Sequence, residues 1–368
     1  MKKVKFVIIS LFFMLTGCGG SGGSEPIVPP VESGNTLSDI EFILSQVDVP
    51  GISIAVINNY EVVETFAVGV IDQSNQQLVT EQTVFQAASI SKTIASMAII
   101  KWATENQIPL NSDVNQLLNS WHLPENGFTE QNKANIGNIL SHTAGINVSG
   151  FPGYNSNTSL PTLVQILNGD ALTNTDAIKI VAEPTTQWKY SGGGYTVLQK
   201  MIEDQTGLSF KDFMHQEVIE FLGLSNSTFE QNSGLDSLTR SSGHIQGAST
   251  INGQYHIYPE LAAAGFWSNA HDLAQIAIQL QLALKNESHL LTSEQAQQML
   301  TSSVKSTYGM GLELFGNGYF GHTGSNEGFR SLMRLNHNGY GLIVLTNSDD
   351  AEQLTKSLIK LFADKYGQ

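Results

Sequence analysis

The chain has 368 residues, with 33 acidic and 18 basic side chains and a formal charge of −15, and its 41% hydrophobic content excludes wholesale disorder. The acidic balance argues against a nucleic-acid binder, because a broad phosphate-binding surface needs clustered Lys and Arg. The single cysteine excludes an intramolecular disulfide framework and a cysteine-rich zinc site.

The N-terminus has the pattern of a lipoprotein signal. Three lysines precede an apolar run over residues 6–15, which is too short to span a bilayer but suits a signal-peptide core. The run ends in residues 15–18 (LTGC), which resemble the lipobox of bacterial lipoproteins. A buried core cysteine is the alternative, but the Gly/Ser/Pro stretch that follows cannot pack around it. We therefore expect cleavage after residue 17 and a lipid on Cys18.

Residues 18–36 comprise the lipidated cysteine and a predicted tether. Glycine and serine make its first part flexible, and Pro29 and Pro30 stiffen the second. We therefore expect a lipid-anchored membrane protein of the cell envelope that faces the periplasm or the exterior. Gly19 is not the aspartate associated with inner-membrane retention, so the outer membrane is expected in a Gram-negative host.

Residues 37–368 form one predicted body without an internal repeat. Hydrophobic periodicity predicts, in chain order, a helix over 37–47, strands over 51–57 and 62–70, buried helices over 89–105 and 195–206, strands over 309–315, 319–323, 330–336 and 341–346, and a helix over 352–366. We expect an α+β fold in which an antiparallel sheet is flanked by helices. Residues of about 37–105 and 300–368 would form an α/β lobe, and a mainly helical lobe over about 106–300 would be inserted into it.

Two glycine-rich patterns are rejected by their context. Residues 19–23 (GGSGG) fit G-x-S-x-G, but they lack the strand and helix that a nucleophile elbow needs. Residues 316–321 (GNGYFG) fit G-x-G-x-x-G, but a strand follows instead of a helix, so we expect a hairpin. The nine histidines show no ligand spacing, and we expect neither a metal nor a cofactor.

The pattern S-x-x-K at residues 89–92 (SISK) carries the first candidate chemistry. Residues 302–305 and 357–360 match the pattern equally well, so only their positions in the predicted elements can distinguish a functional match from a chance one. Ser89 stands where a loop enters a buried helix, where its N–H could bind an oxyanion. Lys92 follows one turn later, and burial would lower its pKa and let it accept a proton. A capping serine with a snorkelling lysine explains this segment equally well.

Two further segments supply polar partners. Tyr190 precedes a second buried helix and could relay protons near a lysine, although it could also be an ordinary amphipathic tyrosine. Residues 322–325 (HTGS) lie on a strand expected to border Ser89. There Gly324 would let a substrate approach closely and the Ser325 N–H could be a second oxyanion donor. Taken alone, the histidine of this segment is more often a hydrogen-bonded strand residue than a functional one.

In this order the three segments resemble the S-x-x-K, Y-x-N and K-T-G or H-T-G motifs of the serine β-lactamase and penicillin-binding superfamily. The chain is most similar to the group of class C β-lactamases, D,D-carboxypeptidases, D-aminopeptidases and related serine esterases. The resemblance covers about residues 37–362, nearly all of the body, and implies a β-lactamase/transpeptidase-like fold. It includes residues 140–145 (LSHTAG), 264–268 (AGFWS), 308–311 (YGMG) and 345–347 (LTN).

This resemblance implies a serine hydrolase that works through an acyl-enzyme without metal or cofactor. Ser89 would be the acylated nucleophile, Lys92 its proton partner and Tyr190 the general base. The N–H groups of Ser89 and Ser325 would form the oxyanion hole. The implied substrate-binding residues are His322, Thr323, Gly324, Ser325 and Gly192.

Two departures from the family pattern bear on the substrate. His322 stands where many β-lactamases have a lysine that binds the substrate carboxylate, and it is similar to the H-T-G of some D,D-peptidases and D-aminopeptidases. Gly192 replaces the asparagine of Y-x-N that holds the acyl amide, which weakens peptide or β-lactam turnover more than ester turnover. His142 is a further candidate base, which we interpret as structural because it belongs to the helix-end motif 141–145.

We therefore expect a serine hydrolase, an esterase or a D,D-peptidase-like enzyme, that acts on an ester or a D-amino-acid-type amide, with a small-molecule or peptidoglycan-derived substrate. A class C-like β-lactamase is the enzymatic alternative. A catalytically weak penicillin-binding or peptidoglycan-binding protein is the alternative from another class. The protein is expected to be a monomer that does not bind nucleic acid.

Overall fold

The computed structural model describes residues 25–29, 35–232, 237–245, 249–304 and 306–368. The predicted signal peptide and Cys18 lie outside these residues, so their processing stays a prediction. Within the described ranges, no helix is long and apolar enough to cross a membrane. The division into two lobes also stays a prediction.

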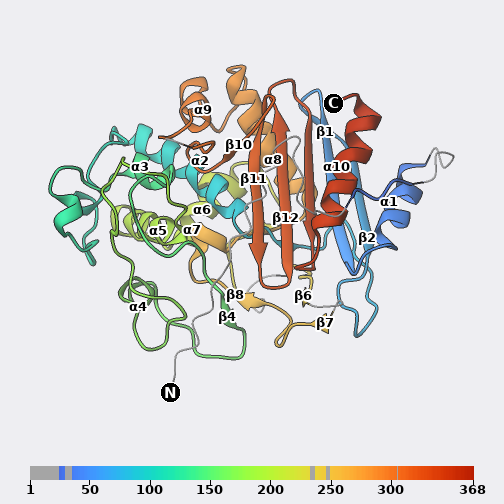
Figure 1. The fold of residues 1–368 in the computed structure, drawn as a ribbon, viewed down its shortest axis with the longest axis horizontal. Coiled ribbons are helices and arrows are strands. Elements are labelled where there is room, and N and C mark those ends of the chain that lie inside the picture. The colour runs from blue at the N-terminus through green and yellow to red at the C-terminus, as the bar shows by residue number, and fades with distance from the viewer. Residues whose placement is uncertain (1–24, 30–34, 233–236, 246–248, 305) are drawn as a thin grey trace.

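A six-stranded antiparallel sheet forms the centre of the molecule, in the order β10-β11-β12-β13-β1-β2 (Figure 1). Its strands are β1 (Gly51–Asn58), β2 (Glu61–Gly69), β10 (Glu313–Gly316), β11 (Tyr319–Asn326), β12 (Phe329–Asn336) and β13 (Gly341–Thr346). Ile54 of β1 lies opposite Phe66 on one side and Val344 on the other. Strands from the two ends of the chain therefore share one sheet, as the sequence predicts.

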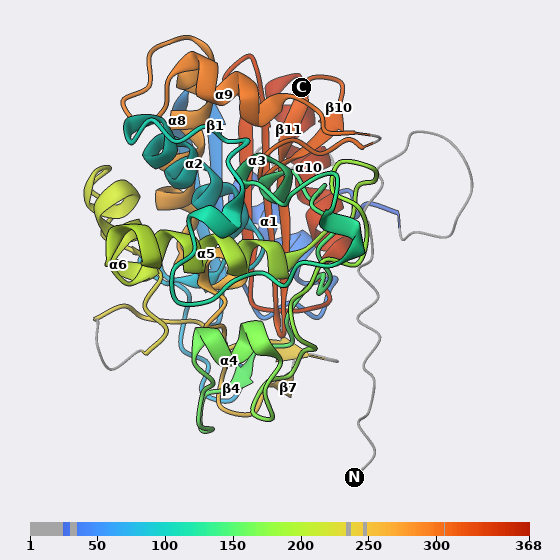
Figure 2. The same ribbon diagram turned by 90° about the vertical axis from the view of Figure 1, so that its left-hand side faces the viewer.

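Helices cover both faces of this sheet and fill the region beside it (Figure 2). They are α1 (Thr36–Leu44), α2 (Ile90–Glu105), α3 (Ile136–Leu140), α4 (Leu163–Asn168), α5 (Gly192–Thr206), α6 (Phe210–Met214), α7 (Leu261–Ala264), α8 (Ala270–Leu284), α9 (Ser293–Leu300) and α10 (Glu352–Tyr366). Short strands link the loops between them: β3 (Phe85–Gln86), β4 (Tyr154–Asn155), β5 (Ser227–Thr228), β6 (His244–Ile245), β7 (Ser249–Thr250), β8 (His256–Ile257) and β9 (Trp267–Ser268). The predicted α+β fold with an antiparallel sheet flanked by helices is confirmed.

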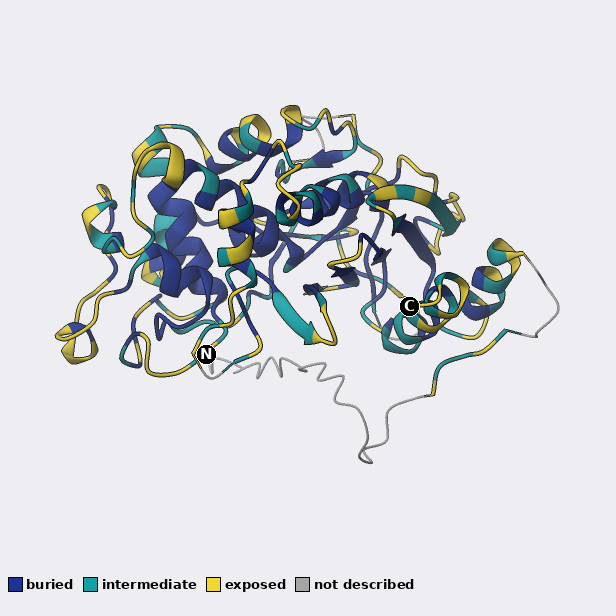
Figure 3. Cartoon of the chain, turned by 90° about the horizontal axis from the view of Figure 1, so that it is seen from above, coloured by how far each residue is buried: buried dark blue, intermediate teal, exposed yellow. Residues whose placement is uncertain are grey.

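Strand periodicity divides the core between the two faces of the sheet, because successive side chains of a strand point to opposite faces. Ile54 packs with residues of α1 and α10 in one cluster of buried side chains. The next residue, Ala55, belongs to the larger cluster that contains residues of α2, α5 and α8. Helix α2 and the central strands are buried along most of their length, and Figure 3 shows buried residues concentrated in the interior of the molecule.

The second buried helix begins three residues before the predicted start. The sequence predicts a start at Tyr195. Three glycines precede this residue, and glycine is a poor helix former. In the structure α5 begins at Gly192, and the Ser191 side chain caps it by accepting a hydrogen bond from Gly194 N at 2.9 Å. The helix therefore starts two residues after Tyr190, which fixes this tyrosine close to a rigid element.

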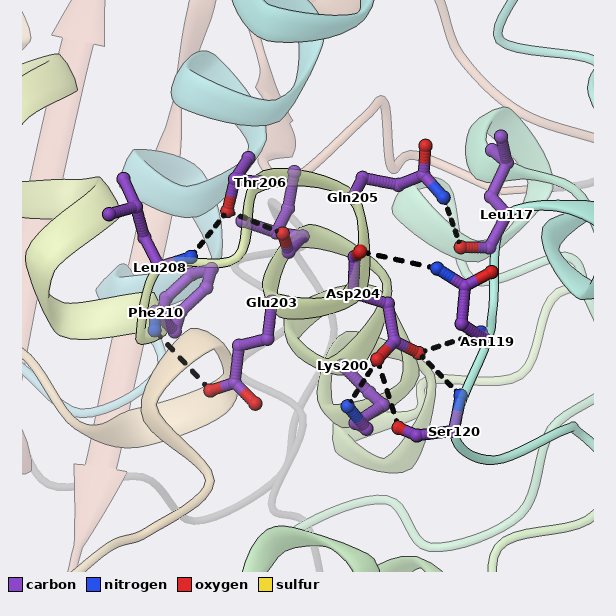
Figure 4. A network of polar contacts seen from close by, with 11 residues as sticks. Leu117, Asn119, Ser120, Lys200, Glu203, Asp204, Gln205, Thr206, Leu208 and Phe210 are labelled. Carbon is purple, nitrogen blue, oxygen red and sulfur yellow. Dashed lines mark hydrogen bonds and ion pairs between the residues drawn. The ribbon is translucent and has the colours of Figure 1, made fainter.

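A polar network holds the other end of α5 (Figure 4). Asp204 accepts hydrogen bonds from Lys200 Nζ at 2.6 Å, Asn119 N at 2.9 Å and Ser120 Oγ at 2.9 Å. Asp204 thereby ties the helix to the loop over 117–120. These partners lower the pKa of Asp204 against the opposite effect of burial, so its carboxylate stays ionised at neutral pH. We interpret this network as structural support for α5.

The hairpin predicted at residues 316–321 is confirmed. Gly316, Asn317 and Gly318 all have positive φ, at 84°, 52° and 79°, and they connect β10 to β11. Strand β10 is shorter than predicted, since residues 309–312 are not part of it. A Cβ at Gly309 would lie 1.9 Å from Met299 O, so this segment is held against α9 instead of extending the sheet.

Candidate active site

Ser89 lies at the entrance of α2, directly after a strained turn. Ala88 has φ 51°, in the left-handed region that non-glycine residues rarely adopt. Ser91 stabilises this turn, because its hydroxyl donates to Ala88 O and accepts from Phe266 N at 3.0 Å. Ser89 is half-buried, whereas the residues on either side of it are buried. The turn therefore presents the Ser89 side chain to a space that a ligand can reach.

Lys92 is buried beside Ser89. Its side chain is 2% exposed, and its Nζ donates to Ser89 Oγ at 3.0 Å and to Ala263 O at 2.7 Å. Burial lowers the pKa of Lys92 to about 7. The Ser89 side chain makes no capping hydrogen bond to α2. The alternative of a capping serine with a snorkelling lysine therefore does not describe this pair.

Tyr190 lies on the other side of the same hydroxyl. The Lys92 Nζ is 5.0 Å from the centre of the Tyr190 ring, and the Tyr190 hydroxyl hydrogen-bonds to Ser89. Burial raises the pKa of Tyr190 above its ordinary value, and the bond to Ser89 offsets only part of this effect. The structure thus brings together three of the predicted residues, Ser89, Lys92 and Tyr190, from two distant parts of the chain.

Strand β11 packs against the turn that precedes Ser89. A Cβ at Gly324 would lie 2.5 Å from Ala87 O and 2.0 Å from Ser331 Oγ, so only glycine fits there. Ser331 Oγ also donates to Ala87 O at 2.7 Å. Ser325, the next residue of β11, is exposed. The predicted neighbourhood of β11 and Ser89 is therefore present.

Thr323 is held by the carboxylate of Glu313, a residue to which the sequence assigned no role. Its N and Oγ1 both donate to Glu313 Oε1, at 3.2 Å and 2.9 Å. Burial raises the pKa of Glu313, and the two bonds from Thr323 oppose this shift. Glu313 lies ten residues earlier on β10, and no spacing rule pointed to it.

His322 has surroundings that differ from those expected of a carboxylate-binding group. Its side chain is 2% exposed, with Nε2 2.7 Å from the Tyr308 hydroxyl and Nδ1 hydrogen-bonded to Thr323 O. Burial, together with the nearby Lys92, lowers the pKa of His322 to about 3. The ring is therefore neutral and its two nitrogens are engaged within the chain. Binding a substrate carboxylate there would require the Tyr308 contact to break, so this role stays a prediction.

Gly192 is enclosed by the loop that precedes β4. A Cβ at Gly192 would lie 3.1 Å from Phe151 Cε2 and 3.2 Å from Ser149 O. The backbone N–H of Gly192 also donates to Ser149 O at 3.1 Å. The edge of a phenyl ring and a carbonyl oxygen would thus be in tight contact with the first atom of a side chain at residue 192. Phe151 is the specific neighbour that the sequence pattern could not reveal.

Tyr308 is a third residue of the site, after Glu313 and Phe151, to which the sequence assigned no role. It belongs to residues 308–311, which were quoted for the resemblance but received no role. The Tyr308 ring centre lies 6.1 Å from that of Tyr190 and 4.7 Å from that of His142. Burial raises the pKa of Tyr308 well above its ordinary value, so its hydroxyl stays protonated and can donate to His322.

Comparisons with known proteins agree with this fold. A family model described as Beta-lactamase matches residues 40–363. Protein flp of Staphylococcus aureus (strain MRSA252) is 24% identical over 323 residues, which are 84% of this chain and 61% of that protein. The chain therefore spans less than two thirds of this curated relative.

Two solved structures are similar over nearly the whole chain. The octameric penicillin-binding protein homologue from Pyrococcus abyssi has a TM-score of 0.73 at 23% identity, covering 91% of this chain and 78% of its own. The D-amino acid amidase from Ochrobactrum anthropi SV3, in complex with L-phenylalanine amide, has a TM-score of 0.67 at 16% identity. It covers 88% of this chain and 96% of its own. At these identities the likeness establishes the fold.

Proposed function

The chain belongs to the β-lactamase family, and from this premise we propose that it is a serine hydrolase that forms an acyl-enzyme on Ser89. One observation carries the proposal: Lys92 Nζ, with a pKa of about 7, lies 3.0 Å from the half-buried Ser89 hydroxyl. An amine with this pKa is neutral in about half of the molecules at pH 7, which suits a general base.

In the proposed reaction the neutral Lys92 amine takes the Ser89 proton as Oγ attacks the substrate carbonyl carbon. The bond between this carbon and the leaving oxygen or nitrogen then breaks, and the leaving group takes a proton through the Tyr190 hydroxyl. Water hydrolyses the acyl-enzyme and restores Ser89. Because burial raises the Tyr190 pKa, we assign Tyr190 as a relay that is protonated at rest, and Lys92 as the base.

The proposed substrate is an ester or a D-amino-acid-type amide. The absence of an asparagine side chain at Gly192 supports this choice, since a substrate acylamino group loses its expected partner there. The likeness to a D-amino acid amidase in fold is in keeping with it.

We also propose that Cys18 carries a lipid, which the loss of fatty-acid incorporation in Cys18→Ser would test.

A panel of substrates tests this proposal. We expect kcat/KM for p-nitrophenyl esters to exceed that for a chromogenic cephalosporin, because an ester needs no acylamino contact at position 192. D-amino-acid p-nitroanilides and their L-enantiomers complete the panel. The reverse ranking would favour the class C-like β-lactamase. Failure of every substrate and of covalent probes would favour the peptidoglycan-binding alternative, which the departure at Gly192 keeps open.

Phe151 and Gly192 together should set the balance between substrate classes. We expect Gly192→Asn alone to lower ester turnover, because the new side chain would meet Phe151 Cε2 and Ser149 O within about 3 Å. In Phe151→Ala/Gly192→Asn the ring is gone, and the added amide can bind an acylamino group.

The double variant should raise the ratio of cephalosporin to ester turnover by about tenfold, the effect of one new hydrogen bond. Phe151→Ala alone is the matched control, since it opens the same space without adding a partner. An equal ratio in Phe151→Ala and in the double variant would contradict this assignment. The assignment would also be contradicted if Gly192→Asn alone kept its ester turnover and gained cephalosporin turnover.

A further inference from the structure

His142 is held in an unusual backbone conformation directly after α3. Its φ is 59°, in the left-handed region where helices usually end on glycine or asparagine. A histidine there has a conformational cost that glycine would not have. The side chain is nevertheless 1% exposed, so it is retained inside the protein. The burial of a histidine side chain on such a backbone calls for a reason beyond the end of a helix.

Two hydrogen bonds connect His142 to the residues on either side of Tyr190. The carbonyl oxygen of His142 accepts from Lys189 N at 2.8 Å, and its ring Nδ1 accepts from Ser191 N at 3.1 Å. The centres of the His142 and Tyr190 rings are 4.3 Å apart. The main chain of Tyr190 is thus bracketed on both sides, and its ring packs on the same imidazole.

The bond from Ser191 also fixes the state of the imidazole. Because Nδ1 is an acceptor, the neutral ring carries its proton on Nε2. Burial, together with the nearby Lys92, lowers the pKa of His142 well below its ordinary value. The Nε2 atom is buried without a hydrogen-bond partner among the described residues, and the rings of Tyr190 and Tyr308 lie beside it.

We propose that His142 is a positioning residue that sets the place of the Tyr190 hydroxyl by bracketing residues 189–191 and packing against the Tyr190 ring. This inference rests on the proposed function for its kinetic consequence and on geometry alone for the bracket. It replaces the interpretation of His142 as part of a helix end only. The imidazole does not exchange protons with the substrate; it acts through Tyr190.

A pair of substitutions separates this role from helix termination. His142→Gly suits the left-handed backbone but removes the acceptor and the ring. His142→Asn also tolerates this backbone and keeps an acceptor oxygen close to the place of Nδ1. If His142 only ended a helix, both variants would be fully active. Gln107→Gly is the matched control, since Gln107 is an exposed residue with φ 58° after α2.

We expect His142→Gly to lower kcat for p-nitrophenyl acetate by about a hundredfold, the cost of a misplaced catalytic group, with little change in KM. His142→Asn should recover at least about tenfold of this loss, because the bond from Ser191 N is restored. Gln107→Gly should keep the unmutated kcat. Thermal unfolding of each variant, followed by circular dichroism, checks that the fold is intact.

A second measurement does not depend on turnover. Nitrogen-15 NMR of histidine-labelled protein should show His142 protonated on Nε2 and unprotonated on Nδ1, and this state should persist as the pH falls through the ordinary pKa of histidine. Full activity of His142→Gly, equal losses in His142→Gly and His142→Asn, or titration of His142 near pH 6.5 would each overturn the proposal. If the unmutated protein hydrolyses nothing, the proposed function fails, and the NMR result still decides whether the bracket exists.

Discussion

Ser89→Ala should lower ester turnover by about a thousandfold or more, because it removes the hydroxyl that we propose forms the acyl bond. The Ser89 side chain is half-buried, and the substitution removes only one oxygen atom, so the fold should be unaffected. The measurement is kcat/KM for p-nitrophenyl acetate, with thermal unfolding as the check on folding.

The chain offers a matched control for this variant. Ser357 begins the S-x-x-K pattern at residues 357–360, but its hydroxyl donates to Gln353 O within α10. Ser357→Ala should therefore keep the unmutated kcat/KM. Equal activity in Ser89→Ala and Ser357→Ala would show that the reaction does not pass through Ser89.

Lys92→Met should lower kcat by at least about a hundredfold and should also remove a limb of the pH profile. Burial lowers the pKa of Lys92 to about 7, so the amine loses its proton as pH rises through this value. Because only the neutral amine can take the Ser89 proton, kcat/KM of the unmutated protein should rise with pH and level off above about 7. Methionine fills the same buried space without a basic group, so this rise should disappear.

Tyr190→Phe distinguishes the base from the relay. It should cost about a hundredfold in kcat but keep the rise through pH 7, since Lys92 is still present. Lys360→Met, at the lysine of the S-x-x-K pattern over residues 357–360, is the matched control for Lys92→Met. A rise with pH that persists in Lys92→Met but vanishes in Tyr190→Phe would reverse the two assignments.

The sequence predicted the parts of this structure that local patterns encode. Short runs of apolar, largely β-branched residues predicted β1 and β13, and the Ala-, Ile- and Met-rich segment after Ser89 predicted α2. The start of α5 was missed because three glycines oppose helix formation locally, whereas the Ser191 cap and tertiary packing favour it. Local propensity cannot anticipate such a tertiary effect.

The site shows the same division. Ser89 and Lys92 are one helical turn apart, so their contact follows from sequence spacing. Glu313, Tyr308 and Phe151 reach the site through the packing of distant segments, and no spacing rule predicts them. The surroundings of His322 also depend on such packing, since Tyr308 engages its Nε2.

The most direct test of the proposed acyl-enzyme is mass spectrometry of the unmutated protein after reaction with a fluorophosphonate and, separately, with a penicillin. We expect the fluorophosphonate to add one adduct per chain, located by peptide mapping on Ser89 and absent from Ser89→Ala. An adduct on another serine, or an adduct that persists in Ser89→Ala, would contradict the assignment of Ser89 as the nucleophile.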